Sequence, residues 1–479
     1  MLPDLVDPTL PADSAPVTSD DSSSDAQARA LAEYERLKAL QVEWMASLPA
    51  ALEPAYPFVP ANASIPLYKG PLRFDTPNGT YSMQGVMEIA WEPSPRLRYA
   101  SAENLPLELA PLVFGQVNAD GYPEDTTVVP DMPSGTWDPV EEPTADGYLT
   151  HLDIGSGDEF SHVTFGIANF MDYLGAWVRH DEHAAHGRVE MVGCGWHLTI
   201  DDRHDKEETF KHLKRRGGYA VTHVGQVRRS DGRSFNRSEA QEILDGLYWF
   251  LSFVKGSACG PLLPVGFDQS GAATWARWGV PTIARWPGSI GWADEHRPEE
   301  LARLFPGFIE KWLDTYWRRA VYIGVGYYLE ANGPTTVERA LSQAQVVLEM
   351  LAHAVLVEGG HKTLEDLKPI GVGIARLLEH FGVPIEIPEE LPELRAEAKG
   401  AGWESGPWAV SELRNEIIHA KRGASERPFR VTIQAWKLIS WYVELVLLAL
   451  FGFDGEYGSR LKWPRWVGQV ELVPWATTS

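Results

Sequence analysis

Cysteine is nearly absent from this chain of 479 residues. The only two cysteines are Cys194 and Cys259, and neither stands at a metal-ligand spacing from a second ligand. A disulfide framework of the kind that stabilises small secreted domains is therefore excluded. Such sparing use of cysteine fits the reducing cytoplasm, where we expect the protein to act.

Positive charge is also scarce. The chain has 42 Lys and Arg against 66 Asp and Glu, which gives a formal net charge of −24 at pH 7. This charge excludes a protein that coats nucleic acid electrostatically, so any contact with RNA has to be local. The basic stretches from Lys211 to Arg216 and from Lys421 to Arg430 are the candidates for such contact.

We expect no secretory signal at the N-terminus. The first 25 residues are rich in Pro, Ser and Asp and lack the basic start and apolar middle of a signal peptide, so a disordered acidic tail is predicted over residues 1–25. The most apolar stretch, from Val431 to Phe451, is too short and too interrupted by Glu444 to span a bilayer. We therefore expect no membrane association, and a buried core helix or a dimer seam at this stretch.

The length of the chain allows about three domains. A helix is predicted from Ala26 to Met45, capped by Asp25 and docked on a neighbouring domain, and a proline-dense linker completes residues 26–64. Residues 65–297 read as a β-rich domain. Its clearest strand-like runs are Thr80 to Trp91, Arg188 to Ile200 and Tyr219 to Val227, and one helix is predicted from Ser238 to Lys255.

Helical periodicity dominates from residue 298 to residue 479. Breaks at Gly333-Pro334, at Gly359-Gly360 and from Pro384 to Pro392 separate the segments. The predicted helices are Glu299 to Leu329, Thr335 to Val357, Leu367 to Phe381, Pro407 to Arg422 and Val431 to Phe451. The predicted fold class is α+β, with a β-rich N-terminal domain followed by an all-α bundle.

The predicted helix from Pro407 to Arg422 brings together an arginine, an amide and a histidine. Asn415 and His419 are four residues apart and share the polar side of the helix. Arg414 is separated from His419 by about 7.5 Å of rise and roughly 140° of rotation on an ideal helix, so it borders the apolar side. The apolar stripe that faces a core consists of Val410, Leu413 and Ile417. One chain alone would thus form a poor site.

Two other Arg-to-His pairs have a similar spacing, but their context differs. The pair of Arg179 and His186 lies in a His-rich loop, and the pair of Arg216 and His223 is interrupted by two glycines. Only Arg414 and His419 have a helix start before them and an apolar helix after them. They are therefore the best candidates for chemistry.

The Arg-Asn-x-x-x-His arrangement resembles the signature of HEPN domains, small helical bundles that act in many prokaryotic defence and toxin proteins as metal-independent ribonucleases. The layout, a β-rich region followed by a helical bundle with this motif, looks like that of ApeA-type abortive-infection proteins, which are bacterial anti-phage effectors. The resemblance implies that the bundle cleaves RNA, with tRNA as the candidate target, and that the N-terminal region senses a phage-derived trigger protein or ligand. It also implies a homodimer or higher oligomer, in which Arg and His of two chains form one site, and no cofactor.

The residue types suit this chemistry. RNA carries its own nucleophile, the 2′-hydroxyl, so cleavage needs a group that moves protons and others that stabilise charge on the phosphate. His419 would transfer protons, and a position in the last helical turn would favour its protonated form. Arg414 would hold the phosphate, and Asn415 would orient His419 or the phosphate. Glu349, on an amphipathic helix, is either a polar partner or a surface carboxylate.

Other polar and aromatic clusters have structural explanations. His180, His183 and His186 could bind Zn²⁺ from one helix face, but a solvated loop or helix end also explains them. The polar run from Asp201 to Asp205 reads as a hairpin turn. A group of tryptophans, at 275, 278, 286 and 292, is either a stacking platform for bases or buried packing, and packing is favoured.

Two functions of other classes remain open. The bundle could be a non-catalytic HEPN-like module for dimerisation or nucleotide binding. Alternatively, the whole chain could be a scaffold whose β-rich domain binds a carbohydrate or a peptide on its tryptophans.

Overall fold

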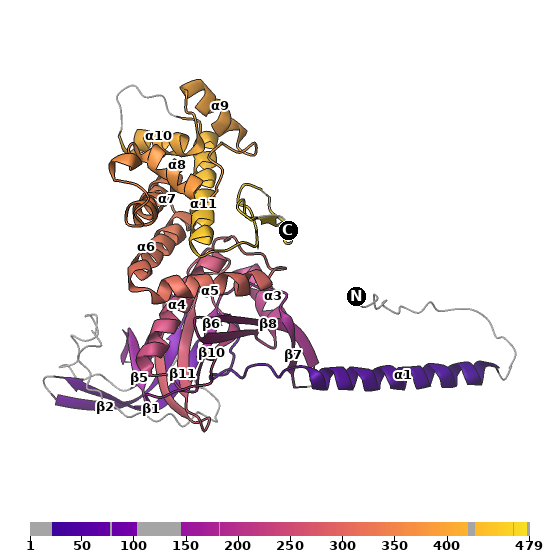
Figure 1. The fold of residues 1–479 in the computed structure, drawn as a ribbon. Coiled ribbons are helices and arrows are strands. Elements are labelled where there is room, and N and C mark those ends of the chain that lie inside the picture. The colour runs from indigo at the N-terminus through magenta and orange to yellow at the C-terminus, as the bar shows by residue number, and fades with distance from the viewer. Residues whose placement is uncertain are drawn as a thin grey trace.

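A computed structural model describes residues 22–76, 79–102, 145–181, 183–419, 427–462 and 464–476. After an N-terminal helix come antiparallel sheets, and most of the later helices stand above these sheets in Figure 1. The α+β class is thus confirmed. Most of the predicted acidic tail lies outside the described residues, but its last part, Ser22 to Asp25, already belongs to a helix.

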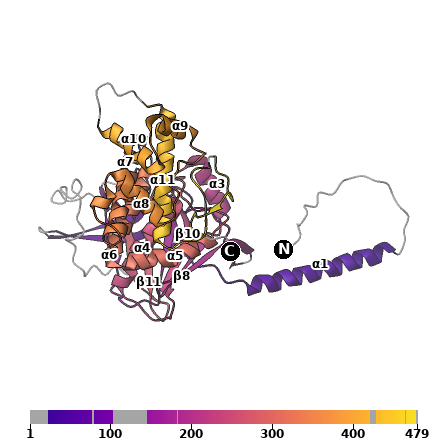
Figure 2. The same ribbon diagram turned by 45° about the horizontal axis from the view of Figure 1, so that its top comes forward.

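The first helix, α1 (Ser22–Ser47), confirms the helix prediction but not the predicted docking. It projects away from the rest of the molecule in both views (Figures 1 and 2). Leu31 is 63% exposed and Leu37 is 56% exposed, because the apolar residues of α1 are interspersed with charged ones on most sides. Close to its end, Trp44 meets Trp177 of the sheet edge, with ring centroids 5.2 Å apart.

Residues 48–64, here called the N-terminal strap, run without helix or regular strand along one end of the sheet, as expected of a proline-dense linker. Side chains of the sheet hold the strap through its backbone. The Leu52 amide donates to Asp201 Oδ2 at 2.7 Å, and Arg188 Nη2 donates to the Ala50 carbonyl at 2.8 Å. The Arg203 guanidinium donates to the Val59 carbonyl at 3.3 Å. The strap is therefore part of the folded body.

The strands form two main antiparallel sheets. A four-stranded meander consists of β1 (Ile65–Thr76), β2 (Gly79–Ala90), β3 (Arg96–Ser101) and β4 (Ala145–Leu149). The eight-stranded sheet has the order β5-β12-β11-β6-β10-β9-β8-β7. Its strands are β5 (His151–Ile154), β6 (His162–Ala168), β7 (Ala176–His180), β8 (His183–Gly193), β9 (Trp196–Asp202), β10 (Val221–Arg229), β11 (Pro261–Phe267) and β12 (Ala273–Gly279).

The predicted strand from Arg188 to Ile200 is in fact a hairpin of β8 and β9. Cys194 and Gly195 form its two-residue turn, with φ of 48° and 77°. Two successive positive φ values are typical of the type I′ turn, which matches the twist of paired strands. The cysteine at the first position gave no turn signal, which is why the pattern read as one strand.

The polar run after β9 was predicted wrongly as a hairpin turn. Asp201 and Asp202 end the strand with buried side chains, and helix α3 (Lys206–Arg216) follows directly. The basic stretch from Lys211 to Arg216 is the last part of this helix, where cations complement the helix dipole. The carboxylates tolerate burial because residues from other strands pair with them.

Beyond residue 298 the described chain is mainly helical, as predicted, with some different boundaries. Asp314 splits the long predicted helix in two, since its side chain accepts from the Tyr316 and Trp317 amides and caps a new helix. A further helix, opened by Pro392, was hidden by the prolines before it. Helix α4 (Arg237–Lys255) lies between β10 and β11, where a helix was predicted. The α-helices described beyond residue 298 are α5 (Glu299–Leu313), α6 (Thr315–Asn332), α7 (Val337–Ala352), α8 (Ile370–His380), α9 (Pro392–Ala401), α10 (Gly406–Ile418) and α11 (Phe429–Leu450).

Short elements complete the fold. A π-helical turn, His353–Val357, extends α7, and a 3₁₀ turn, Glu365–Leu367, precedes α8. After α11, strands β13 (Glu456–Tyr457) and β14 (Glu471–Leu472) pair in the C-terminal segment.

One hydrophobic core joins the large sheet to the helices. Buried residues from β6, β9, α4, α5, α7 and α11 belong to a single contiguous cluster. At Gly193, the end of β8, an added Cβ would lie 2.8 Å from Pro306 Cα, so α5 packs directly on the strand backbone. The sheet and the helices therefore share their interior.

Helix α11 is a core helix. By length and composition, α11 and the segment Val337–Val357 could each cross a membrane, but 72% and 56% of these windows are buried in the protein. Almost all of α11 from Leu438 to Leu448 is buried against the other helices. Of the two expectations for this stretch, the buried core helix is confirmed, because its apolar sides are covered within one chain.

Candidate active site

Helix α10 carries the predicted Arg, Asn and His. Ser405 caps the helix by accepting from the Trp408 amide at 3.3 Å, and Pro407 occupies its first turn. Val410 and Leu413 are buried, and Ile417 packs partly against the core, which confirms the predicted apolar stripe. The stripe fixes the rotation of α10, so the polar residues beside it have a defined position.

Arg414 and Asn415 are neighbours in space as well as in sequence. Arg414 Nη1 lies 3.5 Å from Asn415 Oδ1, at the limit of a hydrogen bond. Arg414 Nε is buried and has no hydrogen-bond partner among the described residues. The guanidinium thus forms no ion pair with any described carboxylate, although it is half buried.

His419 is the C-cap of α10. Its amide donates to the Asn415 carbonyl at 2.9 Å, but its φ of −101° and ψ of 79° take the chain out of the helix. The predicted helix therefore ends before His419, and residues 420–426 lie outside the described part of the chain. The His419 side chain is exposed. No contact joins it to the Arg414 side chain in the described residues.

Arg427, just beyond the undescribed residues, was not singled out from the sequence. It binds Glu416 of α10 through two hydrogen bonds of 2.9 and 2.8 Å, and it also binds Glu397 of α9. These bonds to Glu416 raise the pKa of Arg427, so its charge is neutralised within the fold. Arg427 and Arg414 lie close along the chain, but only Arg414 lacks a described acidic partner.

Glu349 does not join the site. It lies half buried on α7, where its Oε1 accepts from Gln345 Nε2 at 2.7 Å. This contact is made within one turn of α7, and no contact with α10 side chains is recorded for the described residues.

The His-rich segment lies in the hairpin of β7 and β8, so the expected loop or helix end is wrong. The rings of His180 and His183 face each other with centroids 5.7 Å apart. His186 Nδ1 is instead 2.8 Å from the Gly175 carbonyl, and its ring lies against Trp177. No group of three potential ligands, whether His, Cys, Asp or Glu, comes together in the described residues.

A buried charge network at the end of β9 escaped the sequence analysis. His223 Nε2 lies 2.6 Å from Asp202 Oδ1, and the two side chains are almost fully buried. Lys206 Nζ donates to Asp202 Oδ2 at 2.6 Å, and Thr222 Oγ1 lies 2.9 Å from His223 Nδ1. A Thr-His-Asp order is reminiscent of nucleophilic catalysis, but substrate has no access to these groups. We assign the network to the stability of the sheet.

The tryptophans at 275, 278, 286 and 292 pack inside the protein, which was the favoured of the two alternatives. Trp275, Trp278 and Trp292 are at most 2% exposed, and Trp286 is half buried. A different tryptophan, Trp249, lines two surface cavities of about 680 and 820 Å³ together with Tyr248. These two rings line cavities and could stack against a ligand of the β-rich region.

Comparison with known proteins relates the chain to YopA. A model of the YopA central domain matches residues 155–289, and a model of the YopA C-terminal domain matches residues 314–472. The SPbeta prophage-derived uncharacterized protein YopA of Bacillus subtilis (strain 168) is 27% identical over 444 residues, which cover 89% of this chain and 98% of that protein. No solved structure matches. The chain is thus similar to YopA over most of its length, and Arg414, Asn415 and His419 lie in the part that matches the YopA C-terminal domain.

Proposed function

We propose that this protein is an anti-phage defence effector that cleaves RNA, with tRNA as the candidate target, as a metal-independent endoribonuclease of the HEPN type. The observation that carries the proposal is the state of Arg414. Its half-buried guanidinium has no acidic partner among the described residues, whereas nearby Arg427 is bound to two carboxylates. Burying a guanidinium without hydrogen-bond partners costs free energy, and a ligand such as phosphate would offset this cost by accepting its hydrogen bonds.

The chemistry would be an intramolecular transfer. The 2′-hydroxyl of RNA attacks the adjacent phosphorus, the bond from phosphorus to the 5′ oxygen breaks, and a 2′,3′-cyclic phosphate forms. His419 would accept the 2′-hydroxyl proton, and a protonated histidine would return a proton to the leaving 5′ oxygen. Arg414 would stabilise the charge on the phosphate oxygens, and Asn415 would orient the phosphate or His419.

A dimer would supply the second histidine. Ile418, the neighbour of His419 in the chain, is 46% exposed, and Phe429, the first residue of α11, is 67% exposed. The apolar surface available for a contact therefore lies at Ile418 and at the start of α11, rather than along the buried turns of α11. A two-fold contact there would bring the Arg414 and His419 side chains of two chains to one phosphate. The positive groups would also attract RNA locally, despite the net charge of −24.

The N-terminal region is the proposed sensor of a phage-derived trigger. Side chains of the large sheet hold the strap through hydrogen bonds with its backbone, and the sheet shares its core with the helices, so binding at the sheet can influence α10. The prophage origin in the name of the similar YopA protein fits a role in the contest between bacteria and phages.

An RNA cleavage assay tests the proposal. We expect the wild type to cleave RNA in the presence of EDTA and to leave products with 2′,3′-cyclic phosphate ends. Under the same conditions, Arg414→Ala and His419→Ala should each abolish cleavage. The matched controls are Arg395→Ala, an arginine paired with Glu389 near α9, and His380→Ala, a histidine that ends α8 as His419 ends α10. Cleavage that survives both motif changes, or that needs Mg²⁺, would overturn the proposal.

The dimer is tested separately. Mixing Arg414→Ala chains with His419→Ala chains should restore part of the activity, because the shared site of the mixed dimer keeps one intact arginine and one intact histidine, whereas each variant alone lacks one of these residues entirely. Light scattering should give a dimer at micromolar concentration. Full activity from a monomer would exclude the composite site while leaving the nuclease itself in place.

A further inference from the structure

A small cavity between the sheet and the helices has an unusual charge. Its volume is about 190 Å³, and eight residues line it. Four of them are cationic and none is acidic, although acidic residues far outnumber basic ones in the chain. The four cations are Lys437, Arg460, Lys462 and Arg465.

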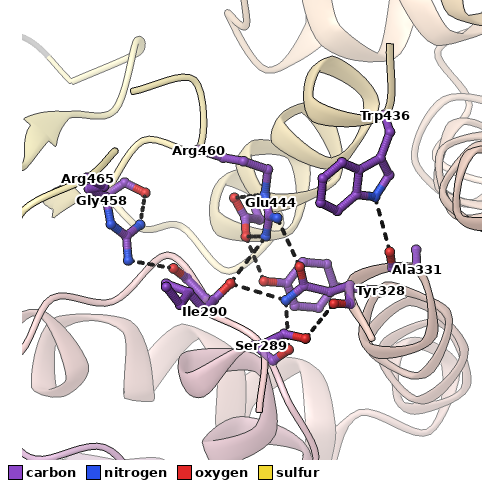
Figure 3. A network of polar contacts seen from close by, with 12 residues as sticks. Ser289, Ile290, Tyr328, Ala331, Trp436, Glu444, Gly458, Arg460 and Arg465 are labelled. Atoms are coloured by element: carbon purple, nitrogen blue, oxygen red, sulfur yellow. Dashed lines mark hydrogen bonds and ion pairs between the residues drawn. The ribbon is translucent and has the colours of Figure 1, made fainter. Parts of the chain in front are cut away.

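Three separate parts of the fold build this cavity. Ile290 and Gly291 come from the segment that leaves the β-rich region, Lys437 and Trp436 come from α11, and the other residues come from the segment after α11. In Figure 3, Arg460 approaches the backbone at Ile290 from above and Arg465 approaches it from the left, while the Trp436 ring lies on the other side of Arg460.

Arg460 lines the cavity with a side chain that is held in place by hydrogen bonds. Its Nε donates to Glu444 Oε2 at 3.1 Å and its Nη1 donates to Asn332 Oδ1 at 2.9 Å (Figure 3). Tyr328 donates its hydroxyl to Glu444 Oε1 at 2.6 Å. The charge of Arg460 is therefore neutralised by one buried carboxylate, and its position is set by three side chains.

Arg465 differs from Arg460 because it binds only neutral groups. Its Nη1 donates to the Gly458 carbonyl at 2.6 Å and its Nη2 donates to the Gly291 carbonyl at 3.0 Å (Figure 3). No described carboxylate forms an ion pair with it, and burial lowers the pKa of its guanidinium. Lys462, in contrast, pairs with Glu471 at the rim. A cation that is partly desolvated and forms no ion pair favours an anionic ligand.

We propose that this cavity binds the phosphate group of a small phosphorylated molecule, held by Arg465 and Lys462, with the organic part against Trp436. One guanidinium group can bind two phosphate oxygens at once through two parallel hydrogen bonds, and a lysine adds a compact positive charge. The orientation of the Trp436 ring is already fixed, since its Nε1 donates to the Ala331 carbonyl at 3.1 Å. The volume lies below the range that holds drug-sized ligands, roughly 300 to 1,000 Å³, so the ligand is small. The proposal does not depend on ribonuclease activity.

Calorimetric titration of the full chain with inorganic phosphate, at constant ionic strength and with chloride as the control anion, tests the site. We expect saturable binding that Arg465→Gln and Lys462→Gln each weaken about tenfold or more, the usual effect of losing a charge-assisted hydrogen bond. Arg319→Gln changes an exposed arginine of α6 outside the cavity and should leave binding unchanged. The melting temperature of each variant without phosphate reports on its folding.

A second titration separates free phosphate from a phosphate ester. Propyl phosphate should bind more tightly than inorganic phosphate to the wild type, and Trp436→Leu should remove this difference while it retains phosphate binding. An ester that binds no more tightly than phosphate would overturn the role of Trp436. Absence of saturable binding at millimolar phosphate, or equal binding by wild type and both cavity variants, would overturn the site.

Discussion

Replacing Lys255 by methionine should stabilise the protein, although it removes a cation. Lys255 is the last residue of α4 and is 6% exposed, and its Nζ has no hydrogen-bond partner among the described residues. The Trp286 ring, 5.4 Å from Nζ, is its described cation–π contact. Burial lowers the pKa of Lys255 from 10.5 to about 8. The folded state therefore binds the lysine proton less tightly than the unfolded state does.

The size of the effect follows from this pKa. At about 1.4 kcal/mol per pKa unit, the shift from 10.5 to about 8 costs the folded state about 3 kcal/mol at pH 7. Because the unfolded state binds more protons between these two pKa values, the free energy of unfolding of the wild type should rise with pH in that window. Lys255→Met should accordingly be more stable than the wild type by up to about 3 kcal/mol at pH 7, and this advantage should shrink by about 2 kcal/mol at pH 9.5.

Urea denaturation at both pH values measures these differences. Lys311→Met is the matched control, because Lys311 also lies over a tryptophan, Trp317 at 5.0 Å, but is only half buried. Its substitution should change the free energy of unfolding by no more than about 0.5 kcal/mol at either pH. A Lys255→Met variant that is less stable than the wild type at pH 7, or whose advantage does not vary with pH, would refute the reasoning.

Three further outcomes are expected. Asp202→Asn should lower the free energy of unfolding by about 3 kcal/mol in urea denaturation, because it breaks the buried pair with His223, and an unchanged stability would contradict the network. A thiol reagent should label exposed Cys194 in the native protein but Cys259 only after unfolding, since burial raises the pKa of Cys259 to about 12, and fast native labelling of both would be inconsistent with the fold. Arg188→Gln should release the N-terminal strap, so proteolysis within residues 48–64 should become faster than in the wild type, and equal rates would show that the strap is held by other contacts.

Local periodicity predicted the helices well where a core face is continuous. The stripe of Val410 and Leu413 placed α10, and the spacing of apolar residues placed α4 within a residue of its start. Helix α3 could not be predicted in this way, because Asp201 and Asp202 look like turn residues until Arg188 and His223, distant in sequence, are seen to contact them. Buried charges are recognisable only with their partners, and the partners depend on the fold.

The candidate site was predictable in its local part alone. The order of Arg414, Asn415 and His419 along α10 follows from the sequence, and so does the apolar side that orients them. The neutralisation of Arg427 depends on α9, whose existence the prolines concealed, so the contrast with Arg414 appeared only in the structure. The sequence left a core helix and a dimer seam open at α11, since hydropathy cannot tell a helix covered by its own chain from one covered by a partner.

The continuous core between the large sheet and the helices also bears on how such proteins can evolve. The regions that match the YopA central and C-terminal domain models contribute side chains to the same cluster, and α5, which lies between these regions, packs directly on β8. Recombination that exchanged one half between two distant relatives would join surfaces that were never selected together. The two halves should therefore be inherited as a pair, with compensating substitutions across their shared interior, rather than shuffled as separate modules.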